Sequence, residues 1–369
     1  MAEQIPVANP KASYLQHKDM IDAAVLKVLN SGQYILGSEV ERFEHGFSGF
    51  TGSKYSIGVA NGTDAITLAL KACGIQPGDE IITTSHSAVA TAAGIELAGG
   101  TPVFVDIDAS TRCIDPGKVE AAVTKRTRGI VPVHVYGQPA DMLSIMEIAG
   151  KYDLVVVEDC AQAHGAKIGG RHVGTFGHAG AFSFYPTKNL GCIGDGGAVI
   201  TDSEIINEKI RALREYGWET RFQSAYPGMN SRLDELQASI LNVKLSSLES
   251  DCARRVEIAA RYTDAIRNTM LQAPFTAMDA VHAMHLYVIE TTERASFMEY
   301  LSGQNISSAL HYPAPIHEQA AYKDRVRIQG RLENTDALYG RIVTLPLYPQ
   351  MTDEDVERVC NVLKGWKGK

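Results

Sequence analysis

Short apolar runs alternate with amphipathic segments along this chain from about residue 54 onward. In the amphipathic segments the apolar positions recur with the spacing of one helix face, whereas the apolar runs have the length of strands. The runs are 55–60, 80–84 and 102–106, and the segments that follow them are 63–73, 88–98 and 115–124. This order predicts that strands and helices alternate.

The apolar runs at 129–135 and 154–158 are rich in β-branched residues and show no polar alternation. Strands of that kind are buried on both faces, which is typical of a parallel sheet covered by helices. Further runs at 180–184 and 198–202 continue the series. The pattern therefore predicts an α/β fold with a mostly parallel central sheet flanked by helices.

Two longer helical segments follow, at 203–216 and 231–268, and we expect the second to break near Leu248. A change of composition near 246–250 predicts a large domain at 1–248, with the N-terminal segment, and a smaller C-terminal α+β domain at 249–369. The predicted elements of the smaller domain are strands at 284–290 and 308–312, a proline-rich loop at 313–317, and helices at 294–302 and 353–364.

Composition narrows the class of protein. The net charge of −8 and the lack of any Lys/Arg run argue against nucleic-acid binding and against a polybasic membrane surface. The six cysteines form no C-x-x-C pair, which suits reduced thiols in the cytoplasm. Because the sequence shows neither a signal peptide nor an apolar run long enough to span a bilayer, we expect a soluble cytoplasmic protein.

One lysine, Lys188, lies between the apolar run 180–184 and a glycine cluster that leads into the run 198–202. The aromatic and small residues around it would solvate an ammonium poorly and would lower its pKa toward the nucleophilic neutral amine. The pattern indicates a Schiff-base lysine. A surface lysine in a turn is the alternative for this residue taken alone.

Residues that directly follow the apolar runs are the next candidates, because ligands of open α/β sheets bind at the carboxyl ends of the strands. Asn61, Gly62 and Thr63 follow the run 55–60 and begin a helix, where backbone N–H groups and the helix dipole favour a phosphate. A capped helix start without a ligand would explain the same residues. Ser183 offers a further hydroxyl for a phosphate.

Asp159 follows the buried run 154–158, where an unpartnered carboxylate is costly. A protonated pyridine nitrogen would be a suitable partner, and the carboxylate would raise the pKa of that nitrogen. A metal held by Asp159 and His164 is the competing idea, but no His-x3-His or second carboxylate at ligand spacing supports it. We therefore expect no metal, and we expect His164 to orient Asp159.

Two other features are ambiguous from the residues alone. The glycines at 191, 194, 196 and 197 precede a strand instead of opening a helix, so they form no dinucleotide fingerprint and disfavour an NAD-dependent oxidoreductase. They predict a tight return that lets the backbone pass close to a bound group. His86 follows the run 80–84 and would either stack on a planar ring or cap a helix.

Four ordered motifs together resemble the DegT-type family of sugar-nucleotide aminotransferases, which carry pyridoxal phosphate on the fold-type I aspartate-aminotransferase fold. The motifs are N-G-T-D-A (61–65), E-D-C-A-Q-A-H-G-A (158–166), F-S-F-Y-P-T-K-N-L-G-x-x-G-D-G-G-A (182–198) and G-M-N-S-R-L-D-E-L-Q-A (228–238). The resemblance runs nearly end to end, from Ile35 to Pro349.

The resemblance implies how the cofactor pyridoxal 5′-phosphate would be held. Lys188 would form the internal aldimine and shuttle the proton, Asp159 would pair with the pyridine nitrogen, and Gln162 would contact the ring 3-hydroxyl. Many relatives have an aromatic residue at the position of Ala88, stacked on the cofactor ring. His86 is the candidate for that stacking role here.

The phosphate of the cofactor would be held by Gly62, Thr63 and Ser183. Asn230 resembles an asparagine that reaches the phosphate across a dimer interface. The resemblance therefore implies an obligate homodimer with shared active sites.

The resemblance also suggests the substrates. The segments 216–222 and 310–317 are similar to those of relatives that aminate carbon 3 of dTDP-linked 3-keto-6-deoxyhexoses, with L-glutamate as the usual donor. The expected contacts to the nucleotide sugar are Arg221, His311, Tyr312 and His317. Loop packing or surface ion pairs would explain these four residues equally well. The amino sugar would serve a surface glycan, such as a lipopolysaccharide O-antigen, or a glycosylated metabolite.

Two alternatives stay open. Relatives that aminate carbon 4 share every cofactor motif. A non-catalytic regulator that binds pyridoxal phosphate would reuse the same fold, although Lys188, Asp159 and Gln162 together argue against it.

Overall fold

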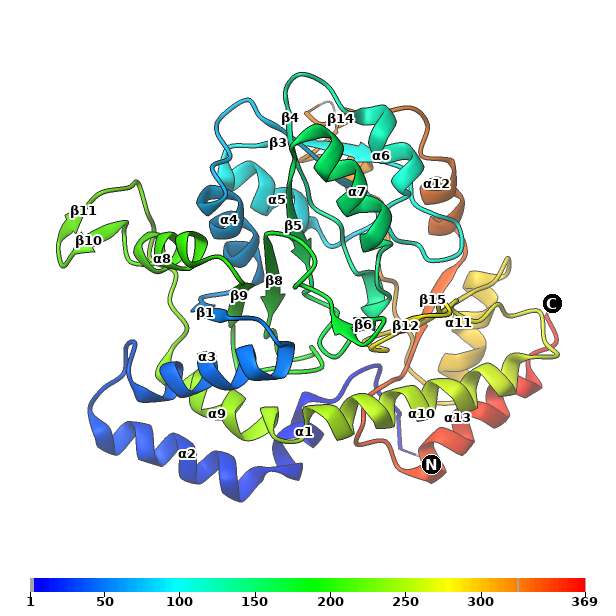
Figure 1. Cartoon of the computed structure of the whole chain (residues 1–369). Coiled ribbons are helices and arrows are strands. Elements are labelled where there is room, and N and C mark those ends of the chain that lie inside the picture. Colours follow the sequence, from blue (N-terminus) through cyan, green and yellow to red (C-terminus); the bar gives the residue numbers. More distant parts are fainter. Residues whose placement is uncertain (1–2, 324, 369) are drawn as a thin grey trace.

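The centre of the molecule is an eight-stranded sheet, seen in a computed structural model that describes residues 3–323 and 325–368 (Figure 1). Its strand order is β1-β9-β8-β5-β4-β2-β3-β14. β9 runs antiparallel to β1 and β8, and the other neighbouring strands are parallel. The bounds are β1 Tyr55–Val59, β2 Glu80–Thr84, β3 Thr101–Val105, β4 Thr127–Ile130, β5 Val155–Asp159, β8 Ala179–Ser183, β9 Gly197–Thr201 and β14 Arg327–Ile328. The predicted α/β fold with a mostly parallel sheet is confirmed.

Helices cover both faces of this sheet (Figure 1). The bounds are α1 Pro10–Gln16, α2 Lys18–Ser31, α3 Ser38–Thr51, α4 Gly62–Ala72, α5 Val89–Ala98, α6 Pro116–Ala122, α7 Met142–Tyr152, α8 Glu204–Leu213, α9 Glu235–Leu245, α10 Leu248–Ile266, α11 Arg294–Gly303, α12 Glu333–Tyr339 and α13 Asp353–Gly365. The apolar core on one face comes from α4, α5 and α8, and on the other face from α3, α6, α7 and α9.

The strands are apolar throughout because they are buried from both sides. Every residue of β2 and β9 is buried. Val156 and Val157 are neighbours in β5, yet they pack into different hydrophobic clusters, as the alternation of side chains along a strand requires. The predicted strand at 80–84 matches β2, and the predicted helix at 63–73 matches α4 to within one residue.

The C-terminal part has its own core, formed by α10, α11, α13 and the antiparallel pair β13 Tyr287–Glu290 and β15 Ile342–Leu345. The strand predicted at 308–312 is not formed. Ala309 makes one isolated bridge to Thr344, because the segment turns away toward the central sheet after that residue. The division at 248/249 stays a prediction, and β14 returns from the C-terminal part to the edge of the large sheet.

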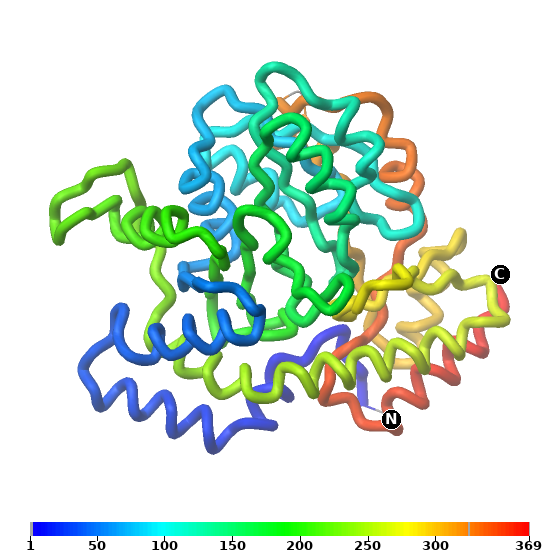
Figure 2. The backbone as a smooth tube through the Cα atoms, viewed as in Figure 1, coloured from blue at the N-terminus to red at the C-terminus, as the bar shows by residue number. Residues whose placement is uncertain are grey.

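A hairpin of β10 Trp218–Thr220 and β11 Gln223–Ser224 projects from the body of the molecule (Figures 1 and 2). Phe222 at its tip is 73% exposed. The remaining short strands β6 Lys167–Ile168, β7 Arg171–His172 and β12 Ala280–Val281 form a separate small sheet. None of the helices in residues 3–323 and 325–368 has the length and apolar character needed to cross a membrane.

A buried ion pair fixes β1 to its neighbours. Glu44 of α3 accepts hydrogen bonds from the backbone N–H of Gly58 at 2.8 Å and from the guanidinium of Arg214 at 2.6 Å. Arg214 also donates to the carbonyl of Gly58 at 2.9 Å. Since α4 begins three residues after β1 ends, this pair positions the strand from which the phosphate-suited helix start emerges.

We expect Glu44→Gln to lower the free energy of unfolding by about 3 kcal/mol, because it leaves the buried Arg214 guanidinium without its counter-charge. Glu41→Gln, on the exposed side of the same helix, is the matched control and should change it by less than about 0.5 kcal/mol. Urea unfolding of both variants measures the difference. Equal midpoints for the two variants would contradict this account.

Candidate active site

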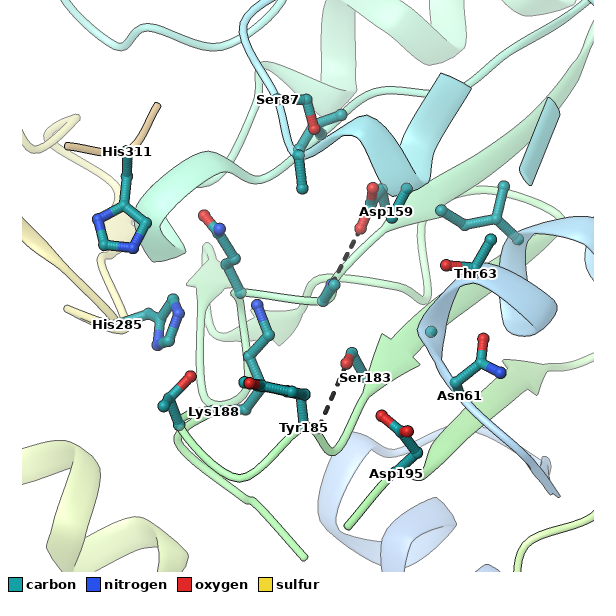
Figure 3. A pocket seen from close by; sticks show the side chains of 18 of the residues that line it. Asn61, Thr63, Ser87, Asp159, Ser183, Tyr185, Lys188, Asp195, His285 and His311 are labelled. Carbon is teal, nitrogen blue, oxygen red and sulfur yellow. Dashed lines mark hydrogen bonds between the residues drawn. The ribbon is translucent and has the colours of Figure 1, made fainter. Parts of the chain in front are cut away.

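A cavity of about 670 Å³ opens at the carboxyl ends of the parallel strands (Figure 3). The start of α4, the end of β5 and the segment after β8 all contribute to its wall. The residues from the sequence-predicted set that line it are Gly62, Thr63, Asp159, Gln162, Ser183, Lys188, His311 and Tyr312. Residues from four separate parts of the chain thus meet in one place.

The first turn of α4 forms one end of the cavity. Asn61 is the N-cap, and its side chain accepts from the backbone N–H of Asp64 at 2.9 Å. A Cβ on Gly62 would come within 2.7 Å of the Cβ of Ser183, so only glycine lets the helix start lie this close to β8. The free N–H groups of the helix start and the hydroxyls of Thr63 and Ser183 therefore line one concave surface suited to a phosphate.

Asp159 lies on the cavity wall with its carboxylate held by two donors. The Thr91 hydroxyl donates to Oδ2 at 2.7 Å, and the backbone N–H of Ala161 donates to Oδ1 at 3.1 Å. Because Thr91 gives its proton to Asp159, its own oxygen accepts from the Ser87 hydroxyl at 2.7 Å. This chain of hydroxyls fixes the carboxylate without neutralising it, so that it remains able to pair with a cationic ring nitrogen.

Lys188 projects into the cavity from the loop after β8 (Figure 3). Its backbone N–H donates to the carbonyl of Tyr185 at 2.8 Å. Burial lowers the pKa of the Lys188 ammonium to about 8, although the Asp159 carboxylate acts in the opposite direction. At a pKa near 8, roughly a tenth of this lysine is the neutral, nucleophilic amine at pH 7, far more than for an ordinary lysine.

Gln162 is oriented by its neighbours. The backbone N–H of Tyr136 donates to Oε1 at 2.6 Å, so that oxygen is the acceptor end of the amide, and Nε2 donates to the Tyr312 hydroxyl at 2.7 Å. One N–H of the Gln162 amide remains for a ligand in the cavity.

Sequence reasoning missed His285, which lies beside Lys188 and His311 in Figure 3. The Asn189 amide nitrogen donates to the carbonyl of Ala283 at 2.9 Å, so Asn189 Oδ1 accepts from His285 Nδ1 at 3.2 Å. The neutral ring therefore keeps the lone pair of Nε2 as an acceptor. His285 lies two residues before a C-terminal strand, and nothing in its local sequence indicates that it faces the pocket.

Burial is the main cause of low pKa values for the two cavity histidines. The pKa of His285 lies well below its usual value because of burial and the nearby Lys188 and Arg255 charges. Burial and Lys188 lower the pKa of His311 to about 4. Both rings are therefore neutral at physiological pH, and Lys188 is the one lysine or arginine among the described residues that line the cavity.

The stacking role predicted for His86 is wrong. Its ring is fully buried outside the cavity, and it bonds to the hydroxyls of Tyr136 at 2.8 Å and Tyr339 at 3.1 Å. Ala88 lines the cavity instead. The chain turns between β2 and α5 in such a way that residue 88 reaches the cavity while residue 86 points toward the C-terminal part.

The structure places three further residues of the predicted set outside the cavity of their own chain. Arg221 is exposed in the projecting hairpin, where its guanidinium lies 5.0 Å from the Phe222 ring centre. Asn230 is exposed beside the base of that hairpin. His317 bonds through Nδ1 to the Ser85 hydroxyl at 2.8 Å and lines a neighbouring hollow.

The expectation for His164 is also wrong. Its ring packs among the rings of Phe47, Phe182 and Phe184, at centroid distances of 5.3 to 6.4 Å. Asp159 takes its hydrogen bonds from Thr91 and Ala161 instead. His164 is therefore part of the aromatic core behind the cavity.

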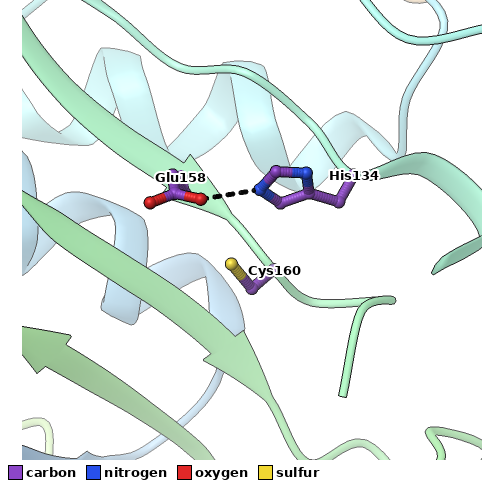
Figure 4. A group of neighbouring side chains, drawn as sticks. All are labelled: His134, Glu158 and Cys160. Carbon is purple, nitrogen blue, oxygen red and sulfur yellow. Dashed lines mark hydrogen bonds and ion pairs between the residues drawn. The ribbon is translucent and has the colours of Figure 1, made fainter. Parts of the chain in front are cut away.

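A compact group of His134, Glu158 and Cys160 lies beside the end of β5 (Figure 4). The backbone N–H of Ala140 donates to His134 Nδ1 at 3.0 Å, so Nε2 carries the proton and donates to Glu158 at 3.0 Å. The other donors to Glu158 are the backbone N–H groups of Gly174 and Gly177, both at 2.7 Å. Hydrogen bonds thus engage both imidazole nitrogens and both carboxylate oxygens, and the group fixes the strand end that carries Asp159.

The cavity has the chemical groups that pyridoxal phosphate requires. The glycine-dependent close approach at Gly62 leaves a concave surface of N–H and hydroxyl donors for the phosphate. A buried carboxylate for a pyridine nitrogen and a lysine of lowered pKa for an aldehyde face the same space. The residues present therefore fit this cofactor.

Comparison with known proteins agrees with this geometry. The DegT/DnrJ/EryC1/StrS aminotransferase family matches residues 16–364. The chain is 46% identical over 359 residues to the dTDP-3-amino-3,6-dideoxy-alpha-D-galactopyranose transaminase of Aneurinibacillus thermoaerophilus, a match that covers 97% of this chain and 98% of that protein.

Two solved structures are similar over nearly the whole chain. The structure of S. venezuelae DesV in complex with a ketimine intermediate has a TM-score of 0.96 and 39% identity, and the match covers 99% of both chains. That of NtdA from Bacillus subtilis with bound cofactor PMP has a TM-score of 0.91 and 31% identity, and it covers 98% of this chain and 85% of that one.

We expect the amine of Lys188 to become reactive with a midpoint near pH 8, against about 10.4 for an ordinary lysine. Labelling of the cofactor-free protein with an acylating reagent across pH 6 to 11, followed by peptide mass spectrometry, measures this midpoint. Asp159→Asn should move it lower, because the carboxylate favours the ammonium form. Asp195→Asn, which also alters a cavity carboxylate, is the control and should leave it in place. A midpoint above 10 would contradict the burial argument.

Proposed function

The chain belongs to the DegT/DnrJ/EryC1/StrS aminotransferase family, and on that premise we propose its reaction. As a member it is an aminotransferase that uses pyridoxal phosphate. We propose that it moves an amino group from L-glutamate to carbon 3 of a dTDP-linked 3-keto-6-deoxyhexose. The observation that carries the proposal is that Lys188 and Asp159 face one cavity whose remaining wall is rich in neutral hydrogen-bonding side chains.

Lys188 is the proton carrier in this proposal. When bound, pyridoxal phosphate supplies an electron sink that makes a neighbouring C–H bond acidic. The Lys188 amine, with a pKa near 8, takes up that proton at Nζ and returns it at a second carbon, so that transfer can run in both directions. Asp159 stabilises a positive charge on the ring nitrogen, and Thr91 holds the carboxylate in place for this task.

Three groups of side chains would hold the cofactor. The start of α4 with Gly62 and Thr63, together with the Ser183 hydroxyl, binds the phosphate. The free N–H of Gln162 donates to the oxygen at position 3 of the ring. Ala88 borders the cavity near the place where relatives carry an aromatic residue.

The substrate side of the cavity suits an uncharged sugar ring. His311 and Tyr312 line it, His311 is neutral, and burial raises the pKa of the Tyr312 hydroxyl so that it remains protonated. Hydroxyl and imidazole groups of this kind exchange hydrogen bonds with sugar hydroxyls. We assign both residues to sugar binding. Relatives named as 3-amino-sugar transaminases favour carbon 3 over carbon 4.

A second copy of the chain would complete the site. Lys188 faces three carboxylates in the cavity, so a nucleotide diphosphate needs cations from elsewhere. Arg221 lies on the projecting hairpin and Asn230 at its base, both exposed and both outside their own cavity. Exposed apolar side chains on α2, among them Leu26 at 57%, offer a surface for association. We therefore propose a homodimer in which each hairpin region serves the partner's cavity.

The wider setting is also part of the proposal. The six cysteines are free, which supports a cytoplasmic location. The family resemblance supports use of the amino sugar in a surface glycan, such as a lipopolysaccharide O-antigen, or in a glycosylated metabolite.

The reaction is tested with the purified protein, L-glutamate and a panel of dTDP-linked 3-keto and 4-keto 6-deoxyhexoses. We expect a 3-amino product from the 3-keto sugar and at least tenfold lower kcat/KM for the 4-keto sugar. Lys188→Ala should abolish turnover, and borohydride reduction of the wild-type holoenzyme should attach the cofactor to Lys188 alone. Faster turnover of the 4-keto sugar would overturn the assignment to carbon 3.

Mixing inactive variants tests the shared site. Lys188→Ala and Asn230→Asp subunits, mixed equally at random, should recover about a quarter of wild-type activity, because half the dimers would be mixed and each would hold one intact site. Lys188→Ala mixed with Asp159→Asn is the control and should stay inactive, since both residues line the same cavity of one chain. Heterodimers of the first pair without activity would count against a shared site.

A further inference from the structure

His86 lies between two tyrosines behind the active-site wall. Its Nε2 is 2.8 Å from the Tyr136 hydroxyl and its Nδ1 is 3.1 Å from the Tyr339 hydroxyl. The two tyrosine rings meet the imidazole edge to face, at centroid distances of 5.5 and 5.4 Å. The three residues come from the turn after β2, from the 3-10 turn Val135–Gly137 and from the end of α12.

The direction of each hydrogen bond in this group is determined. Tyr136 has one hydroxyl proton, and it donates that proton to the backbone carbonyl of His311, which can only accept. The Tyr136 oxygen must therefore accept from His86 Nε2–H.

The directions of the remaining hydrogen bonds in this group follow from the protonation state of His86. Burial and the nearby Arg112 charge lower the pKa of His86 to about 3, so the ring is neutral and has one N–H. With the proton on Nε2, the lone pair of Nδ1 accepts from the Tyr339 hydroxyl. The three hydrogen bonds therefore form a chain in which each group donates to the next, from Tyr339 through His86 and Tyr136 to the carbonyl of His311.

The same tyrosine also fixes Tyr312 through a second route. The backbone N–H of Tyr136 donates to Gln162 Oε1, and Gln162 Nε2 donates to the Tyr312 hydroxyl. Because an amide N–H cannot accept, the Tyr312 oxygen is the acceptor, and its own proton is free to be donated to a ligand. Tyr136 holds this position with a φ of 61°, a left-handed backbone conformation that tyrosine rarely adopts.

Ser85, the neighbour of His86, anchors the other end of the same loop. Its carbonyl accepts from the N–H of Ile316 at 3.1 Å, and its hydroxyl accepts from the N–H of His317 at 3.0 Å. Residues 85 and 86 therefore hold the loop 311–317 at two points. The loop forms no strand, and these contacts position His311 and Tyr312 together with the 2.9 Å hydrogen bond between His311 Nδ1 and the Thr344 hydroxyl.

We propose that Tyr136 is a positioning residue for the sugar substrate, acting with His86 and Tyr339 as one directed hydrogen-bond chain that holds the 311–312 segment and leaves Tyr312 as a hydroxyl donor to a sugar oxygen. This inference rests on the proposed function, since it assigns the ligand of Tyr312 to the nucleotide sugar. The carboxylate of the amino donor is the competing ligand for the Tyr312 hydroxyl. Because the amino donor and the keto sugar react in separate half-reactions, measuring each half-reaction shows which of the two Tyr312 binds.

The test is Tyr136→Phe, studied as holoenzyme in each half-reaction separately. We expect KM for the keto sugar to rise about tenfold, because the His311 carbonyl loses its donor and His86 Nε2–H loses its acceptor. The glutamate half-reaction should change by less than about twofold. Tyr287→Phe is the matched control, since it removes a hydroxyl hydrogen-bonded at 2.9 Å to Thr263 in the C-terminal core. It should leave both half-reactions unchanged.

A double-mutant cycle tests whether the tyrosines act as one chain. Tyr339→Phe should raise KM for the keto sugar about threefold, and adding it to Tyr136→Phe should produce little further change, because the chain is already broken at Tyr136. Fully additive effects would contradict a single chain. A Tyr136→Phe enzyme that is less thermostable but has the wild-type KM would overturn the positioning role. A slower glutamate half-reaction with an unchanged keto-sugar KM would assign Tyr312 to the donor carboxylate and overturn the sugar assignment.

A readout without substrate separates this inference from the proposed function. Long-range ¹H–¹⁵N correlation spectra, with His86 assigned by comparison with His86→Gln, should show the Nε2–H tautomer without titration between pH 5.5 and 8. The opposite tautomer, or a ring that titrates in this range, would refute the chain even if the enzyme aminates the sugar. If the wild-type protein aminates no keto sugar but His86 shows the expected tautomer, the proposed reaction is refuted and the hydrogen-bond chain is supported.

Discussion

The parallel pairing of β5 with β8 is the constraint on which the active site depends. In this register Asp159 lies opposite Ala181, so β5 ends there, while β8 runs on to Ser183 and the loop after it leads to Lys188. The carboxylate and the amine therefore reach the same buried space. Burial favours the neutral amine and Asp159 favours the ammonium, and the balance leaves a pKa near 8. A lysine of that pKa can both accept and release a proton at neutral pH, which reversible transfer between two carbons requires.

Buried carboxylates outside the cavity hold together the elements that surround Asp159 and Lys188. Glu158 binds the N–H groups of Gly174 and Gly177 next to the end of β5, as Glu44 binds that of Gly58 in β1. Glu235 in the first turn of α9 accepts from three backbone N–H groups at the start of α3. In each case a charge satisfies backbone donors that regular secondary structure leaves unpaired. These hydrogen bonds thus tie distant parts of the chain together around the site.

The sheet and the main cofactor candidates were predictable because their signals are local. An apolar run followed by Asn61-Gly62, or by Asp159, marks a strand end from the sequence alone. The position of His86 was not predictable, because its direction depends on how the turn after β2 meets α12, more than 240 residues later. His285 and Tyr136 were missed for the same reason. The strand expected at 308–312 follows its local composition, but the Tyr136 hydroxyl donates to the His311 carbonyl and holds the end of that segment as a loop.

Charge limits what a single chain can bind. The described cavity wall has one lysine against the carboxylates of Asp64, Asp159 and Asp195, and its two histidines are neutral. Of these three carboxylates, that of Asp64 already accepts a hydrogen bond within its own chain, from the buried Ser231 hydroxyl at 2.6 Å. Ser231 directly follows Asn230 and also accepts from the N–H of Ala60, so the hairpin base is fixed to the phosphate end of its own chain's site. Because Arg221 lies on a hairpin anchored there and pointing outward, away from its own cavity, the proposal of an anionic nucleotide sugar and the proposal of a second subunit rest on the same charge argument.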